Sequence, residues 1–421
     1  MDTSSPGVLP SSLWNLSQMP ILHRLRQSRL ARQFATLLGG RFAAAGIQAV
    51  SIYLLARWSD LTDFGTLSAA LGVAVTLQAI GDAGATTFIV RETAARGINR
   101  NVAYAELLSR LAMGCVVLSG IAVIAGLSLL KDRGYLALLP LAGWIALDRS
   151  SDIRSAIARG LGDVRIGTTN VVCRRLAQLA LFVLAFRSGI ATPWAYSLSL
   201  LAGSGLVLAI MWRKLPRPPV VPLRRWALRH AFIRCRPYWI HSTASQLRNV
   251  DAAIVAGLSG SVQAAYYGVG ARLMTPLRMV PATLATALLP HLVKRGGPGH
   301  KDISLGLLMA ILIAIPYLLL VALSPWAVAH LGADFEGATL PLQIMCLGLA
   351  GSAFISIFNA ILQARRQAQL VARISTLTVL LLLALVVAGT MIHGALGAAI
   401  GFMIATLAQA AMVFLGAKKS A

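Results

Sequence analysis

The feature of this sequence that most constrains its fold is a series of apolar segments, each about 20 residues long, separated by short polar or basic connections. A segment of this length crosses the hydrocarbon core of a bilayer as an α-helix, which satisfies every backbone polar group internally. The 421 residues are 57% hydrophobic and only 12% charged, about half the charged fraction of typical soluble domains. The sequence therefore predicts an all-α, polytopic membrane protein.

About twelve spans follow from this criterion. They lie at 36–56, 64–88, 104–129, 135–157, 166–186, 193–212, 237–257, 264–290, 303–328, 339–362, 369–391 and 394–416. A basic, Pro-rich stretch at 213–236 separates the sixth predicted span from the seventh. We therefore predict two six-helix bundles, at 36–212 and 237–416, joined by a cytoplasmic linker at 213–236. A basic tail at 1–35 and a short C-terminus at 417–421 complete the prediction.

The basic residues predict the orientation of these spans. Most of the 38 Lys and Arg residues lie in the tail, the linker and the other even-numbered connections. The odd-numbered connections hold only Arg57, Lys131, Arg133 and Arg187. Because cytoplasmic loops are enriched in Lys and Arg, both termini are predicted to be cytoplasmic. The same bias explains the net charge of +24 without a nucleic-acid partner.

The stretch 239–289 is apolar enough to cross a membrane twice, yet it contains charged residues: Arg248, Asp251, Arg272 and Arg278. An Arg at the bilayer centre costs about 2.5–3.5 kcal/mol on insertion scales, so such a residue normally faces a protein interior or a wet cavity. On a helical period, one face of this stretch presents His241, Ser245, Arg248 and Asp251. We interpret this face as the lining of a cavity, with Arg248, Arg272 and Arg278 as its cations.

Polar residues in the first two predicted spans are candidates for the same cavity. Arg41 and Gln48 lie on one face of the first span, and Gln78 and Asp82 lie on one face of the second. Arg41 is also close enough to the cytoplasmic end to reach the lipid headgroups. Asp82 and Asp251 are candidates for ion coupling, and the sequence does not distinguish proton coupling from sodium coupling or from none.

No motif for metal, cofactor, nucleotide or catalysis is found. The four cysteines, Cys115, Cys173, Cys235 and Cys346, are scattered singly, and the seven histidines show no paired spacing. Gly162 and Gly167 have the spacing of a phosphate-binding loop, but Thr168 stands where that loop requires Lys. We therefore predict neither a metal site nor a cofactor, and no catalytic residue.

Several short motifs occur in a characteristic order along most of residues 36–373. They are Leu54-Leu55-Ala56-Arg57 before Asp63-Phe64-Gly65, Gly84 before Arg91-Glu92, Ala158-Arg159-Gly160-Leu161-Gly162, and Asp251, Gly257, Tyr267-Gly268, Ala271-Arg272-Leu273 and Leu289-Pro290. In this order they resemble the oligosaccharide flippases (Wzx-like) of the polysaccharide-transporter family. That family lies within the multidrug/oligosaccharidyl-lipid/polysaccharide exporter superfamily.

The resemblance implies two six-helix bundles around a central cavity, working by alternating access. The cargo would be an undecaprenyl-diphosphate-linked oligosaccharide, moved from the cytoplasmic to the periplasmic leaflet of the bacterial inner membrane. The pathway would be O-antigen, capsule or exopolysaccharide synthesis, and the protein would not be an enzyme. The implied partners are this substrate and membrane lipids, with a polysaccharide polymerase and chain-length proteins as candidates, and the transport unit would be a monomer.

Two alternatives from other classes stay open. A cation-coupled multidrug exporter of the same superfamily would bind cationic drugs through carboxylates, whereas the 239–289 stretch offers three arginines against Asp251. A membrane polysaccharide polymerase or glycosyltransferase could use Asp60 or Asp63 in the first outward loop. The outward loops are short, however, which leaves no extramembrane platform to position a general base.

Overall fold

The structure is a computed structural model that describes residues 29–214, 216–294, 300–365 and 367–419. Within these residues the secondary structure is helical, with no strand. Eight helices are long and apolar enough to cross a membrane by length and composition, which confirms the prediction of an all-α, polytopic membrane protein. The helices α6, α9 and α10 are not among these eight, so the number of twelve spans stays a prediction.

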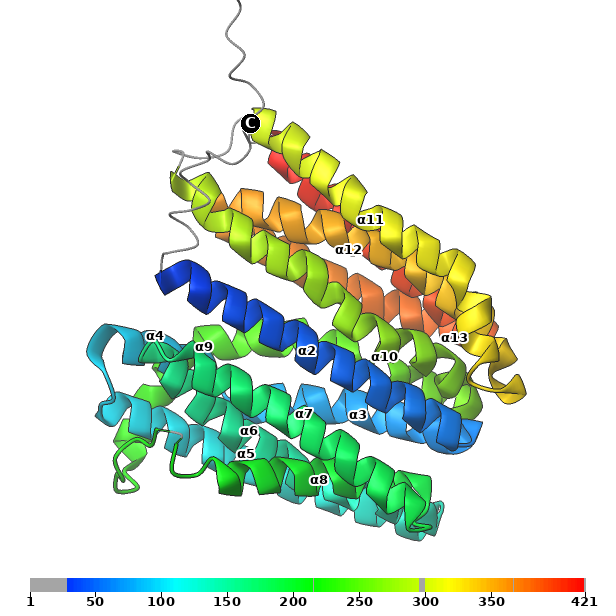
Figure 1. The fold of residues 1–421 in the computed structure, drawn as a ribbon, viewed down its shortest axis with the longest axis horizontal. Helices are drawn as coiled ribbons and strands as arrows, with labels where there is room; N and C mark the ends of the chain where they lie inside the picture. Colours follow the sequence, from blue (N-terminus) through cyan, green and yellow to red (C-terminus); the bar gives the residue numbers. More distant parts are fainter. Residues whose placement is uncertain (1–28, 215, 295–299, 366, 420–421) are drawn as a thin grey trace, which may run out of the picture.

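The helices follow one another with short connections. In chain order they are α2 (Arg29–Trp58), α3 (Leu61–Gly81), α4 (Ala85–Arg96), α5 (Arg100–Leu130), α6 (Leu139–Gly160), α7 (Val164–Arg187), α8 (Thr192–Ile210), α9 (Arg225–Gln246), α10 (Asp251–Lys294), α11 (His300–Ala329), α12 (Thr339–Ala364) and α13 (Ala368–Lys419). Three 3₁₀ turns separate some of them: η2 (Arg133–Leu138), η3 (Leu247–Val250) and η4 (Ala333–Ala338). Figure 1 shows α10 to α13 gathered on one side of the molecule and α4 to α8 on the other.

The predicted span 64–88 is interrupted in the structure. Helix α3 ends at Gly81, and Ala83 and Gly84 adopt positive φ values of 50° and 75° before α4 begins. A Cβ at Gly84 would lie 2.4 Å from the Cys235 carbonyl oxygen of α9, so the close approach of α9 requires glycine here. Hydropathy alone did not reveal this break, because the residues on both sides of it are apolar.

Two helices extend into segments predicted to be connections. Helix α2 begins at Arg29, inside the predicted tail 1–35, and α9 begins at Arg225, inside the predicted linker 213–236. Residues 1–28 of the tail lie outside the described part of the chain. The two helices begin earlier than predicted because a helix can continue past the membrane surface with basic side chains, whereas hydropathy marks only its apolar part.

Helices α10 and α13 each contain a break that divides them into two arms. The backbone is non-helical at Gly260 in α10 and at His393 and Gly394 in α13. In α13 the arms pack directly on each other, since a Cβ at Gly389 would lie 2.2 Å from the Gly397 carbonyl oxygen. The arms coincide with the separately predicted spans 369–391 and 394–416.

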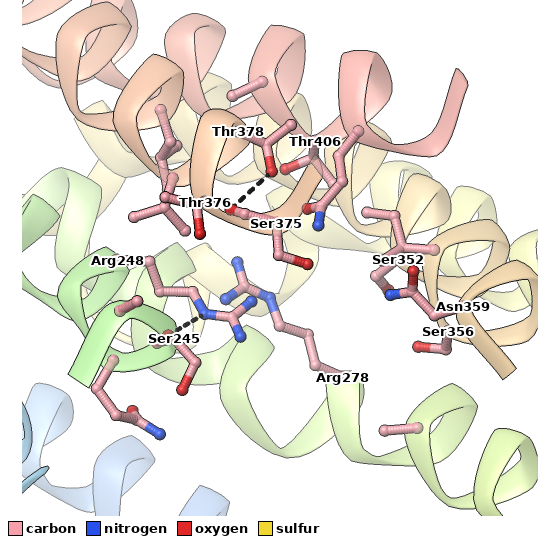
Figure 2. Close-up of a pocket in the computed structure, with 18 of the residues that line it drawn as sticks. Ser245, Arg248, Arg278, Ser352, Ser356, Asn359, Ser375, Thr376, Thr378 and Thr406 are labelled. Carbon is pink, nitrogen blue, oxygen red and sulfur yellow. Dashed lines mark hydrogen bonds between the residues drawn. The ribbon is translucent and has the colours of Figure 1, made fainter. Parts of the chain in front are cut away.

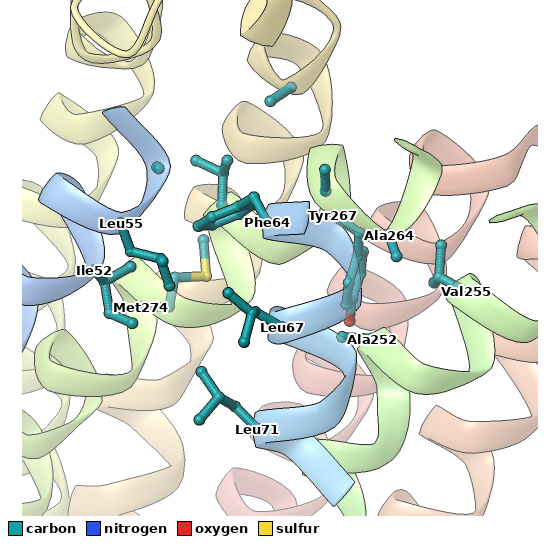
Figure 3. Packing of buried hydrophobic residues seen from close by; sticks show 14 of the residues in the cluster. Ile52, Leu55, Phe64, Leu67, Leu71, Ala252, Val255, Ala264, Tyr267 and Met274 are labelled. Atoms are coloured by element: carbon teal, nitrogen blue, oxygen red, sulfur yellow. The ribbon is translucent and has the colours of Figure 1, made fainter. Parts of the chain in front are cut away.

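The core of the molecule lies where α3 meets α10. About 61% of the apolar window of α3 is buried, against 11% for α5, so α3 is central and α5 lies at the periphery. Phe64 and Leu67 from α3 pack with Tyr267 and Met274 from α10, and all four are fully buried (Figure 3). A Cβ at Gly72 would lie 2.0 Å from the Asn249 carbonyl oxygen. Small residues therefore bring the two halves of the chain into backbone contact.

Candidate functional site

A cavity of about 700 Å³ lies within the second half of the chain. Its described lining comes from α9, η3, α10, α12 and α13, and includes no residue of α2 to α8. The resemblance implied a cavity between two bundles, and the cavity found here lies instead among the helices of one half. Apart from two arginines, its polar wall consists of Ser, Thr, Asn and Gln side chains.

Arg248 and Arg278 are the charged residues of the described lining. Their guanidinium groups lie side by side in the middle of the cavity (Figure 2). The Arg248 Nε donates a hydrogen bond to the Ser245 carbonyl oxygen at 3.0 Å, and the Arg278 guanidinium carbon lies 4.8 Å from the centroid of the Phe402 ring. No Asp or Glu belongs to the described lining, so the two cations face the cavity without a counter-ion on its wall.

The other residues of the predicted face separate in the structure. Ser245 lines the cavity, but Asp251 is buried and accepts hydrogen bonds from the Tyr267 hydroxyl (2.8 Å) and the Ala252 N–H (2.7 Å). The side chain of His241 lies outside the described residues. The physical reason for the separation is η3, because a 3₁₀ turn advances about three residues per turn and shifts the phase of the helical face.

Arg272 also lies apart from the cavity. Its Nη2 donates to the Ser68 carbonyl oxygen of α3, and its Nε is buried without a hydrogen-bond partner in the described structure. This side chain thus belongs to the contact between α3 and α10. The structure brings together two of the three arginines predicted in this stretch.

The polar residues predicted in the first half do not line this cavity. The Gln78 Nε2 donates to the Asp148 Oδ2 at 3.0 Å. Asp82 follows the end of α3, and its carboxylate accepts from the Thr86 N–H (3.2 Å) and the Thr86 hydroxyl (2.6 Å) in the first turn of α4. Arg41 is exposed and Gln48 is half-buried on α2. The proposed ion-coupling roles of Asp82 and Asp251 stay predictions.

Two groups of polar residues were missed by the sequence reasoning. The first is a buried network in which Arg174 pairs with Asp148 and Asp152. The second is the polar wall on α12 and α13, including Ser352, Ser356, Asn359, Gln363, Ser375, Thr376, Thr378 and Thr406. A signal for the second group was present, since polar residues at helical spacing within an apolar span indicate a wet face.

Helices of this length around a cavity that holds two arginines indicate a polytopic membrane protein, and comparison with known sequences gives the family. A family model described as "Polysaccharide biosynthesis protein" matches residues 30–295, more than half of the chain. The chain belongs to this family, which confirms the predicted resemblance to the polysaccharide flippases. No curated protein matches the sequence.

Solved structures show the same fold. The lipid II flippase MurJ in an inward closed conformation has a TM-score of 0.66 at 15% identity, over 91% of this chain and 87% of that one. An inward-facing multidrug resistance MATE family transporter of the MOP superfamily has a TM-score of 0.63 at 15% identity, over 91% and 94%. A MOP superfamily transporter from Pyrococcus furiosus has a TM-score of 0.58 at 14% identity, over 94% and 96%. The family and the fold together support a lipid-linked flippase or a related transporter.

Proposed function

We propose that this protein is a flippase that moves an undecaprenyl-diphosphate-linked oligosaccharide from the cytoplasmic to the periplasmic leaflet of a bacterial inner membrane. The transport would serve the synthesis of a cell-surface polysaccharide. One observation carries the proposal: Arg248 and Arg278 share a cavity whose described lining has no carboxylate. The proposal rests on these two arginines and not on Arg41 or Arg272, which lie elsewhere.

The chemistry of the two arginines matches a diphosphate. A guanidinium group offers a planar fork of N–H donors that binds phosphate oxygens in a bidentate way. Two neighbouring cations repel one another, and an anion between them removes this repulsion. The remainder of the described lining is uncharged, which leaves the arginines as the charge that selects the ligand. An anionic headgroup is therefore the ligand that this cavity favours.

The polyprenyl tail can stay in the lipid while the headgroup passes through the cavity. Outward movement of the anionic diphosphate is favoured by an inside-negative membrane potential, at about 2.3 kcal/mol per charge per 100 mV. Hydrogen bonds from α3 to α9 and from α10 to α3 join the two halves. One of these runs from the Thr76 hydroxyl to the Gln246 carbonyl oxygen, at 3.0 Å. Alternating access would require the halves to move around this contact.

Reconstitution into liposomes with a fluorescent undecaprenyl-diphosphate oligosaccharide tests the proposal. Loss of one charge-assisted contact corresponds to about a tenfold to hundredfold lower rate, and we expect this for Arg248→Gln and for Arg278→Gln. Arg373→Gln is a matched control, because Arg373 is exposed on α13 and is not part of the described cavity lining. Wild-type flipping rates in both cavity variants would show that the cationic cavity is not the path of the headgroup.

The multidrug exporter is the second candidate, and the shared fold with MATE transporters favours it. The charge of the cavity opposes it, because a cationic drug needs a carboxylate and Asp251 is buried in hydrogen bonds to its own helix. A comparison of drug resistance in cells with and without the gene distinguishes the two functions. Resistance that depends on the gene and is unaffected by Arg278→Gln would favour the exporter.

A further inference from the structure

We infer that the cavity contains a distinct subsite for uncharged sugars, formed by one face of α12 next to the arginine pair. The residues of this sugar face are Ser352, Ser356, Asn359 and Gln363, and all four line the cavity. The inference rests on the proposed function, because it assigns the part of the ligand that follows the diphosphate. It names the chemical class of the sugars attached to the diphosphate and the residues that recognise them.

The spacing of the four residues places them on one face. They follow one another at intervals of four, three and four residues, which is the repeat of a single helical face. At about 1.5 Å per residue, the face extends roughly 16 Å along α12. In Figure 2, Ser352, Ser356 and Asn359 lie on the same wall of the cavity, to one side of Arg278.

The sugar face begins near the arginines and leads away from them. A Cβ at Gly348, one turn before Ser352, would lie 3.0 Å from the ring of Phe402. Phe402 is the ring beneath the Arg278 guanidinium. At the other end of the face, a Cβ at Gly416 would lie 3.7 Å from Leu362, so this end lies beside the last turns of α13. A ligand with its phosphates at the arginines would therefore extend along α12 toward that end.

The hydrogen-bonding capacity of the cavity fits sugar hydroxyls. The Asn359 Oδ1 is buried and has no hydrogen-bond partner in the described structure, and leaving such an acceptor unpaired is costly. The Ser352 hydroxyl donates to the Leu349 carbonyl oxygen at 2.6 Å, and the Thr406 hydroxyl donates to the Phe402 carbonyl oxygen at 2.8 Å. These hydroxyl oxygens can still accept. Each sugar hydroxyl donates one hydrogen and can also accept, so separate hydroxyls of a sugar can donate to these three acceptor groups.

Serines and threonines within membrane helices commonly donate to their own backbone, which explains Ser352 and Thr406 without any ligand. The same explanation does not apply to Asn359 and Gln363, whose amides have both donors and an acceptor. Both side chains line the cavity. A polar ligand accounts for two amides on this wall.

The absence of charge on the described part of this wall defines the class of sugar. No ionisable residue belongs to the sugar face, and Ser375 and Thr376 on α13 are likewise uncharged. The described lining offers the carboxylate of an acidic sugar no cation besides the two arginines, which the diphosphate would occupy, and an unpaired charge in such a site is costly. The subsite is thus suited to neutral hexoses and acetamido sugars.

Three lipid-linked probes with the same undecaprenyl-diphosphate test the subsite. The first carries one N-acetylglucosamine, the second a neutral tetrasaccharide, and the third a tetrasaccharide that contains a uronic acid. We expect Asn359→Leu and Gln363→Leu each to slow flipping of the neutral tetrasaccharide about fivefold, the value of one lost hydrogen bond. The double variant should slow it about 25-fold, with less than a twofold effect on the single-sugar probe. Gln369→Leu, an exposed residue of α13 outside the described lining, should change neither rate.

Equilibrium binding of the same probes to the purified protein in detergent separates this inference from the proposed function. One outcome is that the neutral tetrasaccharide binds more weakly to the sugar-face variants than to the wild type, while the wild type flips no probe. This outcome would support the subsite and refute the flippase. A second outcome is that Asn359→Leu and Gln363→Leu leave the ratio of the flipping rates of the two neutral probes unchanged while flipping still depends on Arg278. That result would refute the subsite and leave the flippase standing. Tighter binding of the uronic-acid probe than of the neutral one would refute the assignment to uncharged sugars. A wild type that neither binds nor flips any probe would overturn both proposals. Monodisperse elution and an unchanged melting temperature show that each variant is folded.

Discussion

A cluster of charged side chains in the first half differs from the arginine pair in the second half in whether the charges have partners. In the first half, Arg174 is buried between Asp148 and Asp152, and the nearby Arg149 reaches Asp82 at 3.5 Å. In the second half, Arg248 and Arg278 face a cavity whose described wall has no carboxylate. Charges with fixed partners hold helices together, whereas accessible charges without partners are available to a ligand. At these two places, the charges that have a counter-ion are structural, and the charges that face the cavity without one are the candidate binding charges.

The largest effect on stability is expected in the first half. Arg174→Leu would leave Asp148 and Asp152 buried without their cation, and breaking a buried pair costs about 3–5 kcal/mol. Thermal unfolding of the purified protein in detergent measures this loss. Arg165→Leu is the matched control, because Arg165 is exposed on the same helix and takes part in no described ion pair. Equal melting temperatures for the two variants would show that the buried network does not stabilise the fold.

A smaller effect is expected for a paired charge outside the candidate spans. Glu92 of α4 accepts hydrogen bonds from Asn101 (2.9 Å) and Asn99 (3.1 Å), and the bond from Asn101 contributes most to lowering the pKa of this carboxyl. A lowered folded-state pKa stabilises the fold above the ordinary carboxyl pKa, and this contribution is lost as the pH falls through the folded-state pKa. We expect Glu92→Gln to cost under about 1 kcal/mol at neutral pH. The difference from wild type should shrink between about pH 5 and pH 3. A difference that grows on acidification would contradict this sign.

The smallest effect on stability is expected at the cavity. Arg278→Gln removes a charge that has no carboxylate partner in the described lining, so the melting temperature should stay within about 2 °C of the wild type. The same variant should lose most of its flipping activity, as proposed above. If Arg278→Gln destabilised the protein as strongly as Arg174→Leu, the distinction between the two halves would fail, because Arg278 would then be a structural charge too.

Much of the fold could be predicted from the sequence, because its determinants are local. The apolar runs predicted membrane helices. The spans 369–391 and 394–416 were predicted separately, and in the structure they are the two arms of α13 on either side of the break at His393 and Gly394. The break before Gly84 was missed, because the residues on both sides of it are apolar and its contact is with Cys235 of α9, far away in the sequence. The start of α9 at Arg225, inside the predicted linker 213–236, was also missed, because hydropathy marks the membrane-embedded part of a helix and not its full length.

The candidate site could be predicted only in part. Arg248 and Arg278 were singled out because a charge within an apolar span is costly, and that cost can be read from the sequence. The same reasoning selected Arg272 and Asp251, which the structure places in contacts with Ser68 and Tyr267. The sequence around these four residues does not distinguish Arg248 and Arg278, which line the cavity, from Arg272 and Asp251, which do not.

The sequence by itself determined that this chain is a multi-pass helical membrane protein of the polysaccharide biosynthesis family, since segment length, hydropathy and motif order are properties of the chain alone. Only the tertiary structure decided which charges have partners. That decision depends on the phase shift at η3 and on polar residues of α12 and α13, about a hundred residues further along the chain. Whether a charged side chain can bind a ligand depends on which side chains pack around it. The neighbouring residues in the sequence do not determine that packing.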